Sequence, residues 1–213
     1  AGKVSRRHTA IVGRIDRQTP ILKSRIHEIN FNPFWNVPVS IIRRDLIKYM
    51  NEDADYLTKQ NIRIYDGQGK QLQPSDINWQ TEDAVNYNFR QDPGPNNSMG
   101  NVKINFHNRH AVYLHDTPTK GLFGENARFY SSGCVRVDEV QDFVEWVLRD
   151  NGDWARPEIA GIFASGERKD VAVKNPVELH TTYISAWANR QGTVSFRDDV
   201  YEFDMAGKVN LEG

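Results

Sequence analysis

The sequence changes its hydrophobic period near residue 138, and this change constrains the fold more than any other feature. From Val140 to Leu148 the apolar residues recur at i, i+3, i+4, i+7 and i+8, which is the spacing of an amphipathic α-helix. Asp138 is suited to cap the start of this helix, and Gly152 lies just beyond its end. Other segments alternate apolar and polar residues, as strands do. We therefore expect a β-rich α+β fold, a curved mixed sheet or sandwich with a flanking helix over 138–150.

Alternating segments that are rich in β-branched residues predict the strands. Residues 8–15 and 24–32 both alternate, and the polar run 17–20 between them is typical of a turn, so we expect a hairpin. Two further strand-like runs lie on either side of residues 107–110. This arrangement places His115 at the end of a strand.

The segment from Trp35 to about Val85 has a different pattern. Ser40 is suited to cap a helix that runs through Met50, and residues 61–72 predict a strand that ends in a glycine-containing turn. From the residues alone, this segment is a small α+β elaboration of the core. A chain of 213 residues is long enough for one large domain, or for one domain with a sizeable insertion.

Composition excludes several classes of function. The formal net charge is −1 and basic residues are not clustered, which argues against nucleic-acid binding. No run of eighteen apolar residues occurs, so we expect no membrane span, and the first ten residues lack the apolar core of a signal peptide. A single cysteine cannot form an internal disulfide.

That cysteine, Cys134, is the principal candidate for chemistry. A thiolate is the most nucleophilic side chain near neutral pH, and it reacts when a base and an open approach are available. Small residues precede Cys134 over 131–133, and the N–H groups of Gly133 and Cys134 are placed to face a developing oxyanion. His115 lies nineteen positions earlier and is a candidate general base. Without further context, a lone cysteine is more often a small buried hydrophobe and a lone histidine a structural residue.

The spacing of these residues resembles the active-site signature of the YkuD-type L,D-transpeptidase family. That signature is a histidine, a spacer, and then Ser/Thr-His-Gly-Cys followed by a hydrophobic residue and asparagine. Here residues 116–130 separate His115 from Ser131, and the motif continues as Ser-Gly-Cys-Val-Arg. Two positions depart from the signature, since Ser132 replaces histidine and Arg136 replaces asparagine. The variant is similar to the branch of large periplasmic Gram-negative enzymes resembling YcbB, as are the segments 29–38, 61–69 and 89–106.

The resemblance implies a complete reaction. It covers 1–213 as one catalytic domain of the YkuD type, with 35–85 as an inserted capping subdomain over the active site. In peptidoglycan, Cys134 would attack the bond between a diamino acid and the terminal D-Ala of a tetrapeptide stem, and an amine of a neighbouring stem would resolve the thioester. The implied partners are donor and acceptor stem peptides, carbapenems would act as inhibitors, and the location would be the periplasm. No metal or organic cofactor is implied.

Two other functions stay open at this point. With water as the acceptor, the same site is an L,D-carboxypeptidase. A non-catalytic module that binds the cell wall would retain tryptophans and loops but would have no use for a Cys–His pair.

Residues near the pair on extended segments are expected to share its side of the sheet. Arg136, two residues after Cys134, would bind a substrate carboxylate and favour the thiolate, or would pair with Asp138 or Glu139. Tyr113, two residues before His115, would contact substrate or fill the core. The family tends to orient its histidine with a backbone carbonyl, and the Asp116 side chain should point away from the ring.

Further candidates have equally plausible structural roles. Ser131 and Ser132 would hydrogen-bond the catalytic pair or a ligand, or would simply be small. Trp35 and Trp79 flank the expected insertion and would wall a substrate groove or belong to the core, the more frequent role of a tryptophan.

The alternative to a thiol site is a metal site formed by histidines. His107, His110 and His115 place three imidazoles within nine residues. On a strand, a turn and a second strand, however, the three rings need not converge, and neither an HExxH motif nor a cysteine pair accompanies them. We therefore expect no metal centre.

Overall fold

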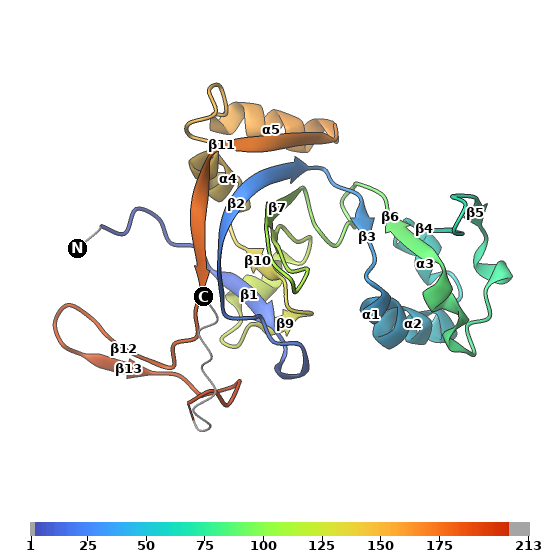
Figure 1. Cartoon of the computed structure of the whole chain (residues 1–213), viewed down its shortest axis with the longest axis horizontal. Coiled ribbons are helices and arrows are strands. Elements are labelled where there is room, and N and C mark those ends of the chain that lie inside the picture. The colour runs from blue at the N-terminus through green and yellow to red at the C-terminus, as the bar shows by residue number, and fades with distance from the viewer. Residues whose placement is uncertain (1–2, 205–213) are drawn as a thin grey trace.

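The computed structural model describes residues 3–204, which build a mixed seven-stranded sheet with a smaller unit beside it (Figure 1). The strand order is β11-β2-β7-β8-β10-β1-β9, in which β8 is parallel to β10 and β1 is parallel to β9. The expectation of a β-rich α+β fold with a mixed sheet is confirmed. The strands are β1 (Ala10–Gly13), β2 (Leu22–Phe31), β7 (Val102–Phe106), β8 (Leu114–His115), β9 (Phe129–Ser131), β10 (Val135–Val137) and β11 (Lys169–Thr181).

Two helices, α4 (Val140–Val147) and α5 (Arg156–Ser165), cover one face of the sheet. The predicted amphipathic helix is therefore present, and its apolar side chains pack against strand residues such as Ile29 and Ile104. The N-cap position belongs to Glu139, in the left-handed region with φ 46°, and not to Asp138. Asp138 instead extends the pairing of β10 with β1, because its N–H donates to the Thr9 carbonyl.

The expected hairpin between residues 8–15 and 24–32 is wrong. Strand β1 pairs with β9 and β10, β2 pairs with β7 and β11, and β7, β8 and β10 lie between them. The linking residues form a 3-10 turn, η1 (Ile15–Arg17), that folds back on Gly13 so closely that a Cβ there would lie 2.1 Å from the Arg17 carbonyl oxygen. The alternation of apolar and polar residues correctly predicted the two strands, but each strand pairs with strands that are distant in the sequence.

The face of the sheet opposite the helices carries a row of polar residues. The strand registers place Asp170, Asn30, Lys103, His115 and Arg136 side by side on β11, β2, β7, β8 and β10. The residues that alternate with them, including Ile29, Ile104 and Leu114, point into the helix-covered core. A sheet with one solvated face thus presents a polar row that ends at the predicted site.

Residues 35–91 form the smaller unit, which we call the insert. Its sheet has the order β3-β6-β4-β5, and its core is separate and centred on Ile42, Leu57, Ile64 and Phe89. The helix predicted to begin at Ser40 begins at Val39, after Pro38, and contains one π-helical turn. The elements are β3 (Trp35–Asn36), α1 (Val39–Ile41), η2 (Ile42–Leu46), α2 (Ile47–Glu52), α3 (Tyr56–Lys59), β4 (Ile62–Tyr65), β5 (Gln71–Leu72), η3 (Pro74–Asp76), η4 (Glu82–Asn86) and β6 (Asn88–Gln91).

The described chain ends with a hairpin and a returning segment. Strands β12 (Ala186–Ala188) and β13 (Val194–Phe196) project from the body of the molecule (Figure 1). The chain then returns, and the buried Tyr201 donates a hydrogen bond from its hydroxyl to the Gly13 carbonyl. A further 3-10 turn, η5 (Lys120–Gly124), follows β8. Within residues 3–204, no helix has the length and apolar character needed to cross a bilayer.

Candidate active site

Cys134 lies at the end of a tight loop, residues 131–134, which joins β9 to β10 and which we call the Cys134 loop. The Ser131 hydroxyl donates to the Cys134 carbonyl at 2.5 Å and accepts the Gly133 N–H at 3.1 Å. Gly133 has φ 111°, a conformation that glycine adopts without strain. Ser131 is buried, so its hydroxyl shapes the loop.

A second loop, residues 13–19, supports the first from behind. The Thr19 hydroxyl donates to the Gly133 carbonyl at 3.0 Å and accepts the Gly13 N–H at 2.9 Å. The Arg17 guanidinium donates to the exposed Ser132 hydroxyl at 2.9 Å. The Cys134 loop is therefore held by hydrogen bonds on both sides.

His115 ends β8 and is buried, in register with Arg136 on β10. Its Nδ1 lies 2.5 Å from the Asp116 carbonyl oxygen, and the Ser98 carbonyl is a second backbone acceptor. Burial, reinforced by the charge of Arg136, lowers the pKa of His115 to about 3, and both carbonyls oppose this change. The imidazole is thus neutral at rest, with Nδ1–H on Asp116 and the other nitrogen free to accept a proton.

Asp116 supplies the orienting carbonyl while its side chain is used elsewhere. The carboxylate accepts the Asn101 N–H at 3.0 Å and forms an ion pair with Lys120. The chain approaches so closely here that a Cβ at Gly100 would lie 2.4 Å from the Asp116 carboxylate. The side chain thus points away from the ring and holds the loop that carries Ser98.

The Cys134 thiol interacts with both the backbone and the side chain of Tyr113. Burial raises the pKa of the Cys134 thiol, whereas the Tyr113 N–H and hydroxyl and the charges of Lys103 and Arg136 act to lower it. Burial also raises the pKa of the Tyr113 hydroxyl, which stays protonated and donates to sulfur while it accepts a hydrogen bond from Trp35. A hydrogen-bonded path therefore runs from Trp35 in the insert through Tyr113 to Cys134.

No hydrogen bond joins Cys134 to His115 in the described part of the chain, although Tyr113 contacts both. The Tyr113 and His115 rings lie 5.7 Å apart, edge to face. Hydrogen bonds between catalytic groups are often long without substrate and tighten in the complex. Cys134 immediately precedes β10 and lies beside Tyr113, whose carbonyl accepts the Val135 N–H, whereas His115 lies in register with Arg136.

A cavity of about 210 Å³ lies between the sheet and the insert beside this group. Arg17, Tyr130, Ser132 and Arg136 line it from the core, and residues that include Trp35, Ile41, Asp45 and Tyr49 line it from the insert. The structure thus brings Trp35, Ser132 and Arg136 together at one opening. Trp79 lies elsewhere, since it donates to the Pro74 carbonyl and packs against Phe89 in the core of the insert.

Arg136 is half-buried, and burial lowers the pKa of its guanidinium. The alternative role, an ion pair with Asp138 or Glu139, does not occur among residues 3–204, where the Asp138 carboxylate instead accepts the Glu139 N–H. The buried Nε of Arg136 has no partner among these residues. The guanidinium is therefore available to a ligand in the cavity.

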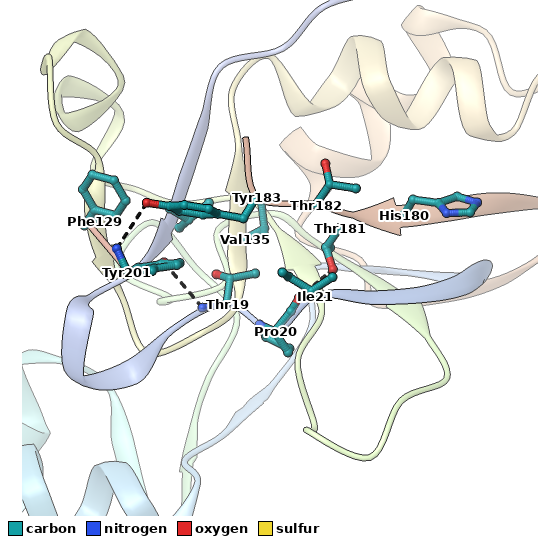
Figure 2. Close-up of a pocket in the computed structure, with 11 residues that line it drawn as sticks. Thr19, Pro20, Ile21, Phe129, Val135, His180, Thr181, Thr182, Tyr183 and Tyr201 are labelled. Carbon is teal, nitrogen blue, oxygen red and sulfur yellow. Dashed lines mark hydrogen bonds between the residues drawn. The ribbon is translucent and has the colours of Figure 1, made fainter. Parts of the chain in front are cut away.

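A larger cavity, of about 310 Å³, lies behind the Cys134 loop (Figure 2). Figure 2 shows Tyr201 and Tyr183 stacked beside Phe129; the Tyr201 N–H donates to the Tyr183 hydroxyl, and the Thr19 N–H donates to the Tyr201 hydroxyl. Val135 and Thr19 also line this cavity, so it lies on the core side of the strand that follows Cys134. Its lining is mainly apolar and aromatic and does not include Cys134, His115 or Arg136.

Sequence reasoning missed three residues of this site: Lys103, Ser98 and Arg17. Lys103 was detectable, because it is the only charged residue in the strand Val-Lys-Ile-Asn-Phe, on the same face as His115. Ser98 contributes its backbone carbonyl, and Arg17 contributes by a hydrogen bond to Ser132 in the Cys134 loop. Neither interaction produces a recognisable pattern in the sequence.

The three histidines of the competing metal constellation are not brought together. His107 stacks on His27 with ring centroids 4.0 Å apart, and His110 is exposed in a turn. Across residues 3–204, no cluster of three or more side chains suited to hold a metal ion was found.

Comparisons with known proteins identify the family of this chain. The family model of the L,D-transpeptidase catalytic domain, YkuD, matches residues 1–179. A Haemophilus influenzae protein provisionally named an L,D-transpeptidase is 36% identical over 204 residues. That alignment covers 94% of this chain and 40% of the relative, so the chain spans less than half of the relative's length. The chain therefore belongs to the YkuD family of L,D-transpeptidase catalytic domains.

Proposed function

We propose that the chain is a cysteine-dependent peptidoglycan L,D-transpeptidase in which Cys134 is the nucleophile and His115 the general base. The observation that carries the proposal is the arrangement around sulfur. A partly buried thiol accepts hydrogen bonds from Tyr113, beside a neutral imidazole oriented by the Asp116 carbonyl. A base that is unprotonated at neutral pH can take the thiol proton as the sulfur attacks.

The first half-reaction would acylate Cys134. Sulfur attacks the carbonyl between the diamino acid and D-Ala, and its proton passes to His115. The imidazolium then has N–H groups for both the Asp116 and the Ser98 carbonyls. When the C–N bond breaks, His115 returns the proton to the departing amine of D-Ala, and a thioester remains.

The oxyanion of this step needs a backbone donor. The Gly133 N–H is already used by Ser131, whereas the Cys134 N–H makes no hydrogen bond to any residue in the range 3–204. We therefore assign the oxyanion contact to the Cys134 N–H, and we give Gly133 the role of turning it toward the cavity.

The second half-reaction would transfer the acyl group. An amine of a neighbouring stem attacks the thioester, His115 takes its proton, and the C–S bond breaks to regenerate Cys134. The products are a 3-3 cross-link and free enzyme, without a cofactor, and the location expected for this chemistry is the periplasm. Water in place of the amine makes the reaction an L,D-carboxypeptidation, the second candidate activity.

Intact-mass analysis with a tetrapeptide muropeptide tests the proposal. The parent protein should show a thioester adduct that has lost D-Ala, together with cross-linked dimer, or tripeptide if water is the acceptor. Cys134→Ala should remain folded, because a small residue replaces a small one, and should form neither adduct nor product. Turnover by folded Cys134→Ala would refute the thiol mechanism and favour a metal-dependent alternative.

A carbapenem provides an independent test. Its strained ring presents a carbonyl to the thiol, so a one-to-one mass adduct should form on the parent protein and disappear in Cys134→Ala. Absence of any adduct at high inhibitor concentration would contradict an open acyl-transfer site.

A further inference from the structure

A second polar cavity, of about 290 Å³, lies on the polar face of the main sheet where the sheet meets the insert. We call it the basic cavity. Its charged lining residues are Arg90 on β6, Lys103 on β7, Asp170 on β11, and Arg168, which immediately precedes β11. Its other lining residues are Asn30, Pro33, Phe34 and Asn36.

Aromatic rings hold the Arg90 guanidinium in place, but no ion pair among the described residues neutralises its charge. Its guanidinium carbon lies 4.3 Å from the Phe34 ring centroid and 4.8 Å from that of Tyr65, and one terminal nitrogen donates to the Tyr65 hydroxyl at 2.8 Å. Its Nε is buried without a partner among residues 3–204. Two aromatic faces thus fix a planar cation whose own hydrogen-bonding capacity is not filled.

The only carboxylate in the lining is already engaged. Asp170 pairs with Arg168 at 3.1 Å and accepts a hydrogen bond from Asn30 at 2.8 Å. Lys103 lies over the Tyr113 ring at 4.6 Å and, within the described residues, makes no ion pair. Arg90 and Lys103 therefore face this cavity without a direct ion pair among the described residues, although the charges of Glu28 and Asp170 also act on Lys103. Three cationic side chains and one carboxylate line the cavity, and this surplus of positive charge suits a ligand of negative charge.

Lys103 links the basic cavity to the surroundings of Cys134. Lys103 lines the cavity, contacts Tyr113 and is in register with His115. Neighbouring strands lie about 4.8 Å apart, so Lys103 on β7 lies about 10 Å from β10, across β8. An extended peptide covers that span with about three residues.

Strand β3 separates the basic cavity from the cavity beside Cys134. Its two residues alternate, so that Trp35 lines the cavity beside Cys134 and Asn36 lines the basic cavity. A peptide that reaches sulfur along the polar row of the sheet would thus meet Lys103 and Arg90 a few residues from the reacting bond.

We propose that the basic cavity binds a free carboxylate of a peptidoglycan stem peptide through Arg90 and Lys103. The inference rests on the proposed function for its ligand, since stem peptides carry free carboxylates on the acidic residue beside the diamino acid and on the diamino acid itself. The donor stem and the acceptor stem both supply this chemistry, and the experiment distinguishes them. Bidentate pairing with a planar guanidinium is the interaction that suits a carboxylate.

Binding is measured first in the Cys134→Ala background, where no reaction can change the ligand. Calorimetry compares a tetrapeptide stem that has free carboxylates with stems amidated at the acidic residue or at the diamino acid. Arg90→Gln should weaken binding of the free stem about tenfold or more, and should leave binding of the correctly amidated stem unchanged. Arg90→Lys keeps the charge but not the planar guanidinium, so its affinity for the free stem should lie between those of the parent and of Arg90→Gln.

Arg149→Gln is the matched control. Arg149 also stacks on an aromatic ring, 4.7 Å from Trp146, and bonds a backbone carbonyl, but it lies on the helix-covered side, outside the basic cavity. This variant should bind both stems like the parent. Equal weakening of free and amidated stems by Arg90→Gln, or no weakening at all, would overturn the carboxylate assignment in favour of a purely structural arginine.

Reactions of the proteins that retain Cys134 then identify which stem is bound. If the donor carboxylate occupies the cavity, Arg90→Gln slows formation of the acyl-enzyme in the absence of an acceptor. If the acceptor carboxylate occupies it, acylation is unchanged and resolution by an added amine stem is slowed. A parent protein that binds the free stem in an Arg90-dependent manner but never acylates would refute the proposed function and leave the cavity assignment standing.

Discussion

Cys134 and His115 are both uncharged at rest, because burial opposes the charged form of each. Burial raises the pKa of the thiol and lowers that of the imidazole, so the ion pair that forms in many thiol enzymes is disfavoured before substrate binds. In the proposed mechanism, protonation of His115 gives the Ser98 carbonyl an N–H to accept, and the Tyr113 hydroxyl, which already interacts with the thiol, then donates to a thiolate. The proposed proton transfer would thus be stabilised during the reaction more than before it.

The pH dependence of acylation should reveal this state. His115 acts as a base only when deprotonated, and with a pKa of about 3 it stays deprotonated through mildly acidic pH. The rate of carbapenem acylation, followed by intact mass, should therefore not fall near pH 6.5, the ordinary value for histidine, but well below it. Arg136→Gln removes a charge that depresses the His115 pKa, so it should move the acid limb upward. An acid limb near 6.5 in the parent protein would contradict a buried, neutral His115.

The lowered pKa of His115 also makes the free energy of unfolding depend on pH. The unfolded chain, with an ordinary His115, takes up a proton below about pH 6.5 that the folded protein does not bind. His115 should therefore lower the free energy of unfolding progressively as the pH falls from there toward 3.

Tyr113 can be tested with a minimal change. Tyr113→Phe removes the hydroxyl that donates to sulfur but keeps the ring that contacts Lys103 and His115. Loss of a hydrogen bond to a developing thiolate should slow acylation about tenfold to a hundredfold, with the melting temperature nearly unchanged. Tyr87→Phe, at a tyrosine that packs against the core of the insert and lines neither the cavity beside Cys134 nor the basic cavity, is the matched control and should react at nearly the parent rate. Equal rates for Tyr113→Phe and the parent would remove Tyr113 from the mechanism.

One ion pair joins the insert to the Cys134 loop at the level of elements. Arg17 bonds both carboxylate oxygens of Asp45 in η2, at 2.7 and 3.0 Å, and also bonds Ser132. The Arg17 side chain is 9% exposed and that of Asp45 is 22% exposed, so solvent screens this pair less than a surface pair. The η2 turn is therefore fastened to the loop that carries Cys134.

Asp45→Asn should loosen this attachment. We expect a loss of about 1–3 kcal/mol in the free energy of unfolding, faster hydrogen exchange over residues 39–52, and more hydrolysed tripeptide relative to dimer, because water enters more readily. Glu82→Gln is the control, since the Arg43–Glu82 pair lies within the insert and is exposed. An unchanged product ratio in Asp45→Asn would limit the pair to a structural role.

The sequence predicted elements better than their arrangement. The helix at Val140–Val147 and the strands near His115 follow from local periods, which the structure retains. The pairing of β1 and β2 with distant strands does not follow from local periods, because a strand shows the same alternation of apolar and polar residues whichever strand it pairs with. Cys134 and His115 were found through their motif, whereas Ser98 and the orienting carbonyl of Asp116 act through backbone atoms that every residue has.

At the scale of the whole molecule, the insert has its own sheet and its own core, and its ends meet. Trp35 pairs with Gln91 and Asn36 with Arg90, so the chain leaves and rejoins the main unit at adjacent positions. We propose that residues 35–91, slightly more than the predicted 35–85, cap the site and exclude water from the thioester. The contacts that support this role are the Arg17–Asp45 pair and the cavity shared with the core.

Replacing residues 37–89 by a short Gly-Ser link tests the cap. The main sheet has a separate core, so the shortened protein should fold and still react with a carbapenem at Cys134. The product ratio should shift from dimer toward hydrolysed tripeptide. An unfolded product would show that the insert completes the core, and a parent-like ratio would show that it does not govern the acceptor.

The returning segment after the hairpin joins the far end of the described chain to the loop behind Cys134. The Tyr201 hydroxyl contacts Gly13 across 188 positions, beside the Thr19 that holds Gly133. Every strand of the main sheet precedes this segment along the described residues. A truncation before Tyr201 would therefore keep the whole sheet and withdraw only a support of the loop that carries the thiol.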